Sequence, residues 1–356
     1  MPSSALEYIT IKGFKSIRSV EKLKLRPINV LIGPNGSGKS NFIGVFAFLH
    51  ALGEGRLRDF VAEAGGAEKL LHFGSKITKE ICFGLSMASG TECEFKLSPS
   101  VDDSLYLSHE SANWILTPDS DAEYGDPTGE GIPQWLRDHS GRWRVYHVHD
   151  TSSSSPMRKT ARVDDNDFLR PDGSNLAAFL YYLREKRGAS YSLIQRTVQR
   201  VAPFFEDFQL KPLKLKPDDI KLEWRHKRSD QYFDASSLSD GTLRFIALAT
   251  LFLQPEEGRP SLILVDEPEL GLHPLAIEIL ASVIRQASVS SQVIVSTQSS
   301  LLLDYFEPQD VLVADRVEGG TQITRLDRPD LATWLEEYSL GQLWEKNELG
   351  GRPVPD

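Results

Sequence analysis

The chain has 356 residues, and because 40% of them are hydrophobic it can bury one large core or two smaller cores. A formal net charge of -10 argues against bulk electrostatic attraction to nucleic acid or anionic lipid, although it is compatible with a local basic patch. The two cysteines, Cys82 and Cys93, lack CxxC spacing, so neither a disulfide framework nor a structural zinc site is expected.

The N-terminal part of the chain predicts the order strand, loop, helix. No charged leader with an apolar stretch opens the sequence, and no apolar run approaches the roughly 20 residues that cross a bilayer. We therefore expect a cytoplasmic protein without a membrane partner. Residues 8–14 and 23–32 predict strands, and residues 41–52 have the apolar spacing of a buried helix.

The loop at residues 33–40 reads GPNGSGKS and satisfies the GxxxxGK[ST] pattern of a phosphate-binding loop. Its glycines allow successive backbone N–H groups to turn inward around a phosphate. Lys39 would then bridge the β- and γ-phosphates, and Ser40 would hold Mg²⁺. A glycine-rich turn with an exposed lysine is the alternative, but the strand before the loop and the helix after it favour a nucleotide. The expected nucleotide contacts are Gly33, Pro34, Asn35, Gly36, Ser37, Gly38, Lys39, Ser40 and Asn41.

The middle of the chain predicts two further lobes. Short alternating runs at residues 79–148, separated by turn residues, predict an antiparallel β lobe. A polar, serine-rich stretch at residues 151–173 predicts a mobile loop at the top of the site. Residues 175–187 and 191–201 predict a pair of helices.

A basic hairpin is predicted at residues 211–233. Cations gather at its tip and aromatic residues flank them: Arg225, Lys227, Arg228, Trp224 and Tyr232. Such a tip could grip the phosphate backbone of DNA. A solvated hairpin on an acidic protein is the alternative.

Two histidines precede the serine-rich stretch. His147 and His149 alternate on a predicted strand and so share a face, and Asp150 follows them. This set could bind a transition metal. Because no third ligand at metal spacing is evident nearby, packing within the nucleotide site or the mobile loop is the interpretation we favour.

The final third alternates helices and strands, which is typical of an α/β core. The expected elements are a helix at 243–253, a strand at 262–265, a helix at 275–286, and strands at 292–296 and 311–314.

An acidic pair, Asp266 and Glu267, follows the apolar run at 262–265. A buried parallel strand ends at the edge where open α/β sheets bind ligands. Asp266 can therefore hold a metal-bound water, and Glu267 can orient the attacking water or accept its proton. A helix cap is the alternative for Asp266. Glu269 and His273 lie in the next turn, where solvated surface is an equally good interpretation.

The sequence LSDGT at residues 238–242 resembles the LSGGQ signature of ABC-type ATPases. Ser239 would begin a helix, where its hydroxyl and the free N–H groups suit a γ-phosphate, and Asp240 and Gly241 would line the same contact. An ordinary N-cap serine followed by glycine is the alternative, and the spacing ahead of Asp266 favours the signature.

Five segments together resemble the ABC-type ATPase heads of the SMC, RecF and Rad50 group: IKGFKSI, GPNGSGKS, LSDGT, LVDEPELGLHP and VSTQS. The likeness is nearest to small stand-alone bacterial AAA-type ATPases labelled as abortive-infection proteins, which are related to the OLD proteins but lack their nuclease domain. It covers nearly the whole chain, including YSLGQLWEKNELGG near the C-terminus. The implied fold is α/β, a P-loop NTPase of the ABC-ATPase type with a mixed central sheet, an antiparallel β lobe and an inserted helical lobe.

The resemblance implies one domain over residues 1–356. Its expected parts are 1–150 with the phosphate loop and the antiparallel lobe, 151–237 with the helical lobe and the basic hairpin, 238–330 with the signature and the acidic pair, and 331–356 with a C-terminal helix and tail.

The resemblance further implies an ATPase that uses ATP and Mg²⁺ and forms a homodimer on ATP binding. The Ser239 loop of one chain would face the Gly33 loop of the other, and Lys15 in the GFKS position would approach the phosphates. The switch position, usually histidine, is Gln298, which can donate a hydrogen bond to a γ-phosphate but cannot carry a proton. We therefore expect slow or partner-dependent turnover.

A plain Q-loop glutamine is not evident, and by position His149 and Asp150 are expected to take its place. The leading functional hypothesis is an ATP-driven switch acting on DNA or an effector protein in bacterial defence or genome maintenance. The second is an ATP-bound scaffold with little hydrolysis that controls a partner nuclease or toxin. The third, a transporter ATPase subunit, is disfavoured by the missing Q-loop, by Gln298 and by the long insert ahead of the signature.

Overall fold

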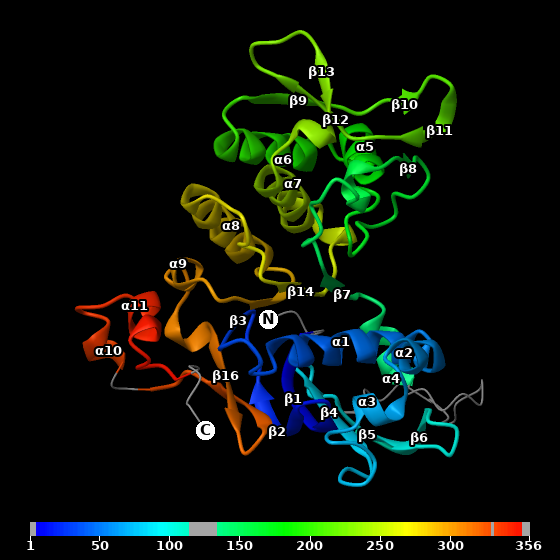
Figure 1. Ribbon diagram of the computed structural model, residues 1–356, viewed down its shortest axis with the longest axis vertical. Coiled ribbons are helices and arrows are strands. Elements are labelled where there is room, and N and C mark those ends of the chain that lie inside the picture. Colours follow the sequence, from blue (N-terminus) through cyan, green and yellow to red (C-terminus); the bar gives the residue numbers. More distant parts are fainter. Residues whose placement is uncertain (1–4, 114–133, 329–330, 351–356) are drawn as a thin grey trace.

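The computed structural model describes residues 5–113, 134–328 and 331–350. Two groups of elements lie on opposite sides of a central sheet (Figure 1). Along the buried strand β3 (Ile28–Ile32), Val30 and Ile32 join one hydrophobic cluster and Leu31 joins the other. The alternation of side chains along a strand therefore supplies both cores from one sheet.

The central sheet has six strands in the order β17-β16-β3-β15-β14-β7, and only β17 pairs antiparallel. Its members besides β3 are β7 (Trp143–Tyr146), β14 (Leu262–Asp266), β15 (Gln292–Ser296), β16 (Val311–Val317) and β17 (Gly320–Arg325). All five residues of β15 are buried, as expected for a strand covered on both faces.

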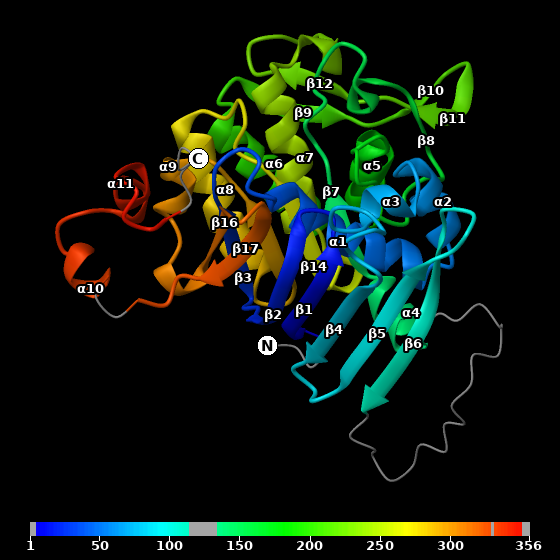
Figure 2. The ribbon, with the colours of Figure 1, turned by 60° about the horizontal axis from the view of Figure 1, so that its bottom comes forward.

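A second, antiparallel sheet has the order β2-β1-β4-β5-β6. Its strands are β1 (Leu6–Phe14), β2 (Ile17–Lys24), β4 (Ile81–Met87), β5 (Glu92–Pro99) and β6 (Leu105–Asn113) (Figure 2). The helix α1 (Lys39–Gly53) packs through Phe42, Phe46 and Phe48 in the cluster shared by this sheet and the central sheet. Three shorter helices lie on the same side: α2 (Leu57–Glu63), α3 (Ala67–Leu70) and α4 (Gln134–Ser140).

Two strand predictions in this half were wrong. Residues 23–32 form the end of β2 and all of β3, because the chain turns at residues 25–27, where Asn29 accepts a hydrogen bond from the Arg26 N–H at 3.0 Å. The strand predicted to complete the antiparallel lobe, β7, instead pairs in parallel with β14 in the central sheet.

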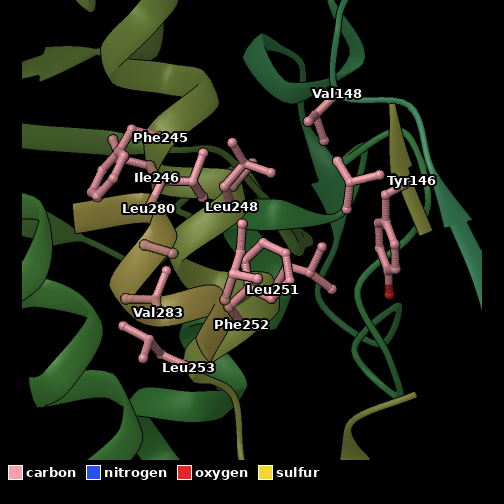
Figure 3. Packing of buried hydrophobic residues seen from close by; sticks show 14 of the residues in the cluster. Tyr146, Val148, Phe245, Ile246, Leu248, Leu251, Phe252, Leu253, Leu280 and Val283 are labelled. Carbon is pink, nitrogen blue, oxygen red and sulfur yellow. The ribbon is translucent and has the colours of Figure 1, made fainter. Parts of the chain in front are cut away.

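Four helices form where helices were predicted: α5 (Leu176–Lys186) and α6 (Gly188–Val201) in the predicted helical lobe, and α7 (Asp240–Leu253) and α8 (Pro274–Ala287) in the part that follows it. They pack together in one cluster. This cluster joins Phe245 and Ile246 of α7 to Leu280 and Val283 of α8 (Figure 3). Tyr146 and Val148, at the end of β7, contribute to the same cluster.

The segment predicted as one basic hairpin contains two antiparallel strand pairs, of which β12–β13 has the basic turn, and each pair belongs to a small sheet. The two sheets have the orders β10-β11-β8 and β13-β12-β9. Their strands are β8 (Ala161–Arg162), β9 (Phe205–Gln209), β10 (Pro212–Leu213), β11 (Lys216–Ile220), β12 (Glu223–His226) and β13 (Tyr232–Asp234). Within the predicted segment β10 pairs with β11 and β12 pairs with β13, while β11 also pairs with β8 and β12 with β9 outside it. The sequence did not reveal this division because each strand has only two to five residues.

The stretch at 151–173, expected to be a mobile loop, is packed against its neighbours. Ser155 and Met157 are buried, and the Arg158 guanidinium donates to the backbone carbonyls of Thr151, Ala235 and Leu238.

The C-terminal segment contains α10 (Leu331–Trp334) and α11 (Leu340–Glu345), and α11 packs against α9 (Ser300–Leu303), the short helix that follows β15. The Gly341 N–H donates to Asp304 Oδ1 at 2.6 Å and ties α11 to the end of α9. The tail after residue 350 lies outside the described residues.

Candidate functional site

Four parallel strands of the central sheet end side by side. In register, Tyr146 of β7 pairs with Val265 of β14, which pairs with Val295 of β15, which pairs with Val30 of β3. Each strand runs into one predicted motif: the histidine pair, the acidic pair, the Gln298 segment and the glycine loop, respectively. The topology therefore gathers motifs from four distant parts of the sequence at one edge.

The glycine loop between β3 and α1 lies against the hairpin formed by β16 and β17. Gly38 has φ 102°, and a Cβ there would overlap Thr321 Oγ1. A Cβ on Gly33 would overlap the Ala314 carbonyl oxygen. Thr321 Oγ1 also donates to the Ser37 carbonyl at 2.8 Å. These two glycines are thus required by close packing as well as by backbone conformation.

Lys39 is 6% exposed and donates from Nζ to the carbonyls of Gly33 at 2.7 Å and Pro34 at 3.1 Å. The ammonium therefore lies across the mouth of its own loop. Burial lowers the pKa of Lys39, and the carboxylates of Glu267, then Asp266, act in the opposite direction.

The side chains of Ser37 and Asn41 pack against other parts of the chain rather than lying at the open edge of the sheet. The Ser37 side chain is buried, and its backbone N–H donates to the Pro34 carbonyl at 3.2 Å within the loop. Asn41 Nδ2 donates to Ser16 Oγ at 2.6 Å, and Ser16 Oγ lies 2.7 Å from Thr321 Oγ1. Asn41 therefore fixes the loop to the turn between β1 and β2.

The structure brings Ser40 and Asp266 together. Ser40 Oγ donates to Asp266 Oδ2 at 3.3 Å, and Ser296 Oγ donates to the other carboxylate oxygen. Mg²⁺ prefers oxygen ligands such as hydroxyl and carboxylate groups, so the Ser40–Asp266 pair fits this ion.

Glu267 and Gln298 also come together, from β14 and β15. The Gln298 side-chain amide donates to Glu267 Oε1. Glu267 has φ 37°, a left-handed conformation that is rare for a residue with a side chain, and its N–H donates to the Ser296 carbonyl at 2.9 Å. Backbone strain of this kind concentrates at functional sites.

Glu269 is 7% exposed, so its interpretation as solvated surface was wrong. Its Oε1 accepts from Thr297 Oγ1 and from the Gln298 N–H at 3.3 Å. Burial raises the pKa of Glu269, and the bonds from Thr297 and Gln298 oppose that rise. His273 is exposed and caps α8 by accepting the Leu275 N–H at 3.3 Å, so it belongs to the surface.

The signature segment begins α7 as expected. Ser239 Oγ accepts the Thr242 N–H at 3.2 Å, and Asp240 pairs with Arg158 at 2.8 Å. A Cβ on Gly241 would overlap the Gly271 carbonyl, so the start of α7 lies directly against the turn that follows the acidic pair.

Arg244, which we did not anticipate, joins three parts of this region. Its guanidinium donates to the carbonyls of Val148 at 3.1 Å, His149 at 2.8 Å and Leu270. Burial lowers the pKa of Arg244. A charged residue within the apolar helix α7 was the available signal, because buried arginine requires partners.

At the end of β7, the assignment of His149 and Asp150 as the Q-loop equivalent stays a prediction. His149 gives its carbonyl to Arg244, and Asp150 accepts from Ser152. His147 has a side chain whose pKa responds to the acidic pair. Burial lowers the pKa of His147, and the Asp266 carboxylate acts in the opposite direction. Within residues 5–113, 134–328 and 331–350 no group of three His, Cys, Asp or Glu side chains could hold a metal, so the transition-metal interpretation is not supported.

Lys15 lies beside the glycine loop in a groove of about 670 Å³ that Asn41 and Phe73 also line. Its backbone has φ 48°, and burial lowers the pKa of its ammonium. Phe73 is 62% exposed with φ 57°, an unusual conformation for a bulky residue. Nothing in the local sequence pattern singles out Phe73.

Only some of the cations of the predicted basic tip are exposed without a carboxylate partner among the described residues. Arg225 Nε pairs with Asp207 at 3.2 Å, and its guanidinium lies over the Tyr232 ring at 5.9 Å. Trp224 is buried and its Nε1 donates to Ser237 Oγ at 2.9 Å. Lys227 and Arg228 remain exposed in the turn between β12 and β13.

Residues 28–304 match the family model described as "AAA domain, putative AbiEii toxin, Type IV TA system". The chain belongs to this AAA family. The match contains the glycine loop, the signature segment, the acidic pair and Gln298. No curated protein matches the chain.

Solved structures show that this AAA domain has the fold of SMC ATPase heads. An SMC head bound to the C-terminal winged-helix domain of ScpA is similar with TM-score 0.61 and 17% identity over 92% of this chain and 99% of that one. The Pyrococcus furiosus SMC head with an extended coiled coil, bound to the C-terminal domain of ScpA, is similar with TM-score 0.59 and 15% identity over 93% of this chain and 98% of that one. The Thermotoga maritima SMC head is similar with TM-score 0.50 and 17% identity over 91% of this chain and 99% of that one. The described residues include no helix long and apolar enough to span a membrane.

Proposed function

We propose that the protein is an ATP-binding and hydrolysing switch. The observation that carries the proposal is the joining of Gln298 to Glu267 beside the Ser40–Asp266 pair. The buried Lys39 lies within electrostatic reach of the same carboxylates. A cation, a hard-metal donor pair and a positioned carboxylate are the parts that phosphoryl transfer to water requires.

Each side chain has a distinct role in this proposal. Inward-facing N–H groups of the glycine loop bind the β-phosphate, and Lys39 turns from its loop carbonyls toward the β- and γ-oxygens. Ser40 and Asp266 would hold Mg²⁺, which neutralises phosphate charge. Glu267 orients the attacking water and accepts its proton, and Gln298 fixes the Glu267 carboxylate and donates to the γ-phosphate.

A homodimer with two composite sites is the second part of the proposal. Ser239 is exposed at the beginning of α7, where the N–H groups of the first turn and the helix dipole favour a phosphate. Leu270 and Leu275 are 43% and 46% exposed on the turn beside it and at the start of α8. Apolar side chains around an anion-binding helix end suit a face that a second copy covers.

The partner acted upon is DNA or an effector protein, in bacterial defence or genome maintenance. Lys227 and Arg228 are the cations available to a phosphate backbone in the β12–β13 turn. A scaffold with little hydrolysis, controlling a partner nuclease or toxin, is the alternative favoured by Gln298, because an amide cannot carry a proton.

Substitution Glu267→Gln tests the central proposal. It keeps the shape of the side chain but removes the base, so we expect ATP and Mg²⁺ to convert this variant from monomer to a stable dimer on size-exclusion chromatography, with hydrolysis lost. Wild-type protein with ATP and Mg²⁺ should hydrolyse ATP. A variant that stays monomeric at saturating ATP and Mg²⁺ contradicts the composite site, and wild-type protein that binds but does not hydrolyse ATP supports the scaffold.

A further inference from the structure

Glu269 is a buried carboxyl that the proposed hydrolytic mechanism does not use. At 7% exposure it is nearly removed from solvent, and its Oε2 is a buried oxygen without a hydrogen-bond partner among the described residues. Leaving a carboxyl in such surroundings costs stability, since a buried polar atom without a partner loses its hydration. A residue retained only for packing would be served better by an apolar side chain.

The bonded oxygen of Glu269 holds the segment that contains Gln298. Oε1 accepts from Thr297 Oγ1 and from the Gln298 N–H, and Thr297 Oγ1 in turn accepts the Ser299 N–H at 2.9 Å. Three consecutive residues after β15 are therefore fixed through one carboxyl oxygen. The Gln298 side chain, which starts from this fixed backbone, reaches Glu267.

The turn that carries Glu269 is itself anchored. The carbonyl of the next residue, Leu270, accepts from the buried Arg244 guanidinium of α7, and Gly271 lies against Gly241 at the start of that helix. Charged groups from each neighbouring element act on this region: Lys39 from α1, Arg244 from α7 and Glu267 from the same turn. Glu269 thus adds a link between this anchored turn and the Gln298 backbone, beside the bond from the Gln298 side chain to Glu267.

We propose that Glu269 is a positioning residue that fixes the Thr297–Gln298 backbone so that the Gln298 amide reaches Glu267. The inference rests on the proposed ATP hydrolysis for its kinetic consequence. It acts on catalysis and not on nucleotide affinity, because its bonds go to the Gln298 segment and not to the glycine loop. A neutral side chain of the same shape retains both accepted bonds through its remaining carbonyl oxygen.

The test compares Glu269→Ala and Glu269→Gln, with Glu278→Ala on the exposed face of α8 as the matched control. For Glu269→Ala we expect kcat for ATP to fall roughly tenfold to a hundredfold, as for a misplaced catalytic group, while KM changes less than about threefold. Glu269→Gln should keep kcat within about threefold of the wild type, which is the range expected when both accepted hydrogen bonds persist. Equal loss in both variants, or an unchanged kcat in Glu269→Ala, overturns the proposal.

Amide hydrogen exchange keeps the inference separate from the proposed ATPase. In Glu269→Ala the peptide that contains the Gln298 N–H should exchange faster, whereas peptides from β3 and α7 should keep wild-type protection. Glu269→Gln and Glu278→Ala should match the wild type throughout. If the wild type hydrolyses no ATP but this local difference is present, the proposed function fails and the positioning role stands. Unchanged exchange at Gln298, or faster exchange throughout the molecule, overturns the positioning role.

Discussion

The side-chain amide of Gln298 donates a hydrogen bond to the carboxylate of Glu267, across the ends of two neighbouring parallel strands. A glutamine at the switch position thus has a partner within its own chain. Because the amide has two N–H groups and one is engaged, the second remains for a γ-phosphate. Gln298 can therefore orient both the carboxylate and the nucleotide without exchanging a proton.

Substitution Gln298→Ala removes this bond while the strands remain intact. We expect kcat for ATP hydrolysis to fall by about one to two orders of magnitude, because Glu267 loses its orientation. The dissociation constant for ATP should change less than about threefold, since the glycine loop supplies most phosphate contacts. Steady-state kinetics with direct nucleotide binding measures both. Unaltered kcat would show that the bond to Glu267 has no catalytic role.

Mixing two inactive variants tests whether sites are shared between chains. Lys39→Ala disables the glycine loop, and Ser239→Arg blocks the signature end of α7. In a mixed dimer one of the two sites combines an intact Lys39 with an intact Ser239. An equal mixture should recover about a quarter of wild-type ATPase activity, because half of the dimers are mixed and each has one good site. Activity that stays absent on mixing argues for sites within single chains.

Glu269 predicts how stability depends on pH. Its pKa is raised in the folded protein, so the stabilising contribution of the protonated carboxyl is full below the unfolded pKa and is lost as pH rises through the folded pKa. Glu269→Gln cannot ionise and should gain stability relative to the wild type between acidic and neutral pH. Urea unfolding of both proteins at pH 5 and pH 8 measures the difference. A constant difference would mean that the carboxyl is ionised in the folded state at both pH values.

The β12–β13 turn predicts the effect of charge on DNA binding. Lys227 and Arg228 are exposed, whereas Arg225 is held by Asp207. If duplex DNA binds there, neutralising Lys227 and Arg228 together should weaken it uniformly across sequences and reduce the salt slope by about two. Arg225→Ala should have the smaller effect. Fluorescence anisotropy over a salt series gives both quantities, and identical slopes for wild type and the double variant would exclude this turn.

The sequence alone was sufficient for the local parts of the site. The apolar run before Gly33, the spacing of the glycines and the helix after Ser40 all reflect neighbouring residues, and the structure has them in that order. The start of α7 at Ser239 was predictable for the same reason, since a cap acts on the next turn.

Non-local contacts account for what was missed. Whether Glu269 is buried depends on Thr297 and Gln298, which pack over it from another strand. The sheet to which β7 belongs is decided by its pairing with β14, more than a hundred residues away, and periodicity within four residues contains no such information. The pairing of Arg225 with Asp207 likewise required the position of β9.

The contact between Thr321 and the glycine loop means that the conformation of this loop depends on residues outside the nucleotide-binding motifs. The Thr321 hydroxyl bonds the Ser37 carbonyl, and Gly38 has room only for hydrogen where that hydroxyl lies. A fragment that ended after α9 would contain the glycine loop, the signature, the acidic pair and Gln298, yet its phosphate loop would lose the wall against which it is folded. The β16–β17 hairpin, which has no nucleotide motif, is for that reason as much a part of the loop's architecture as the glycines.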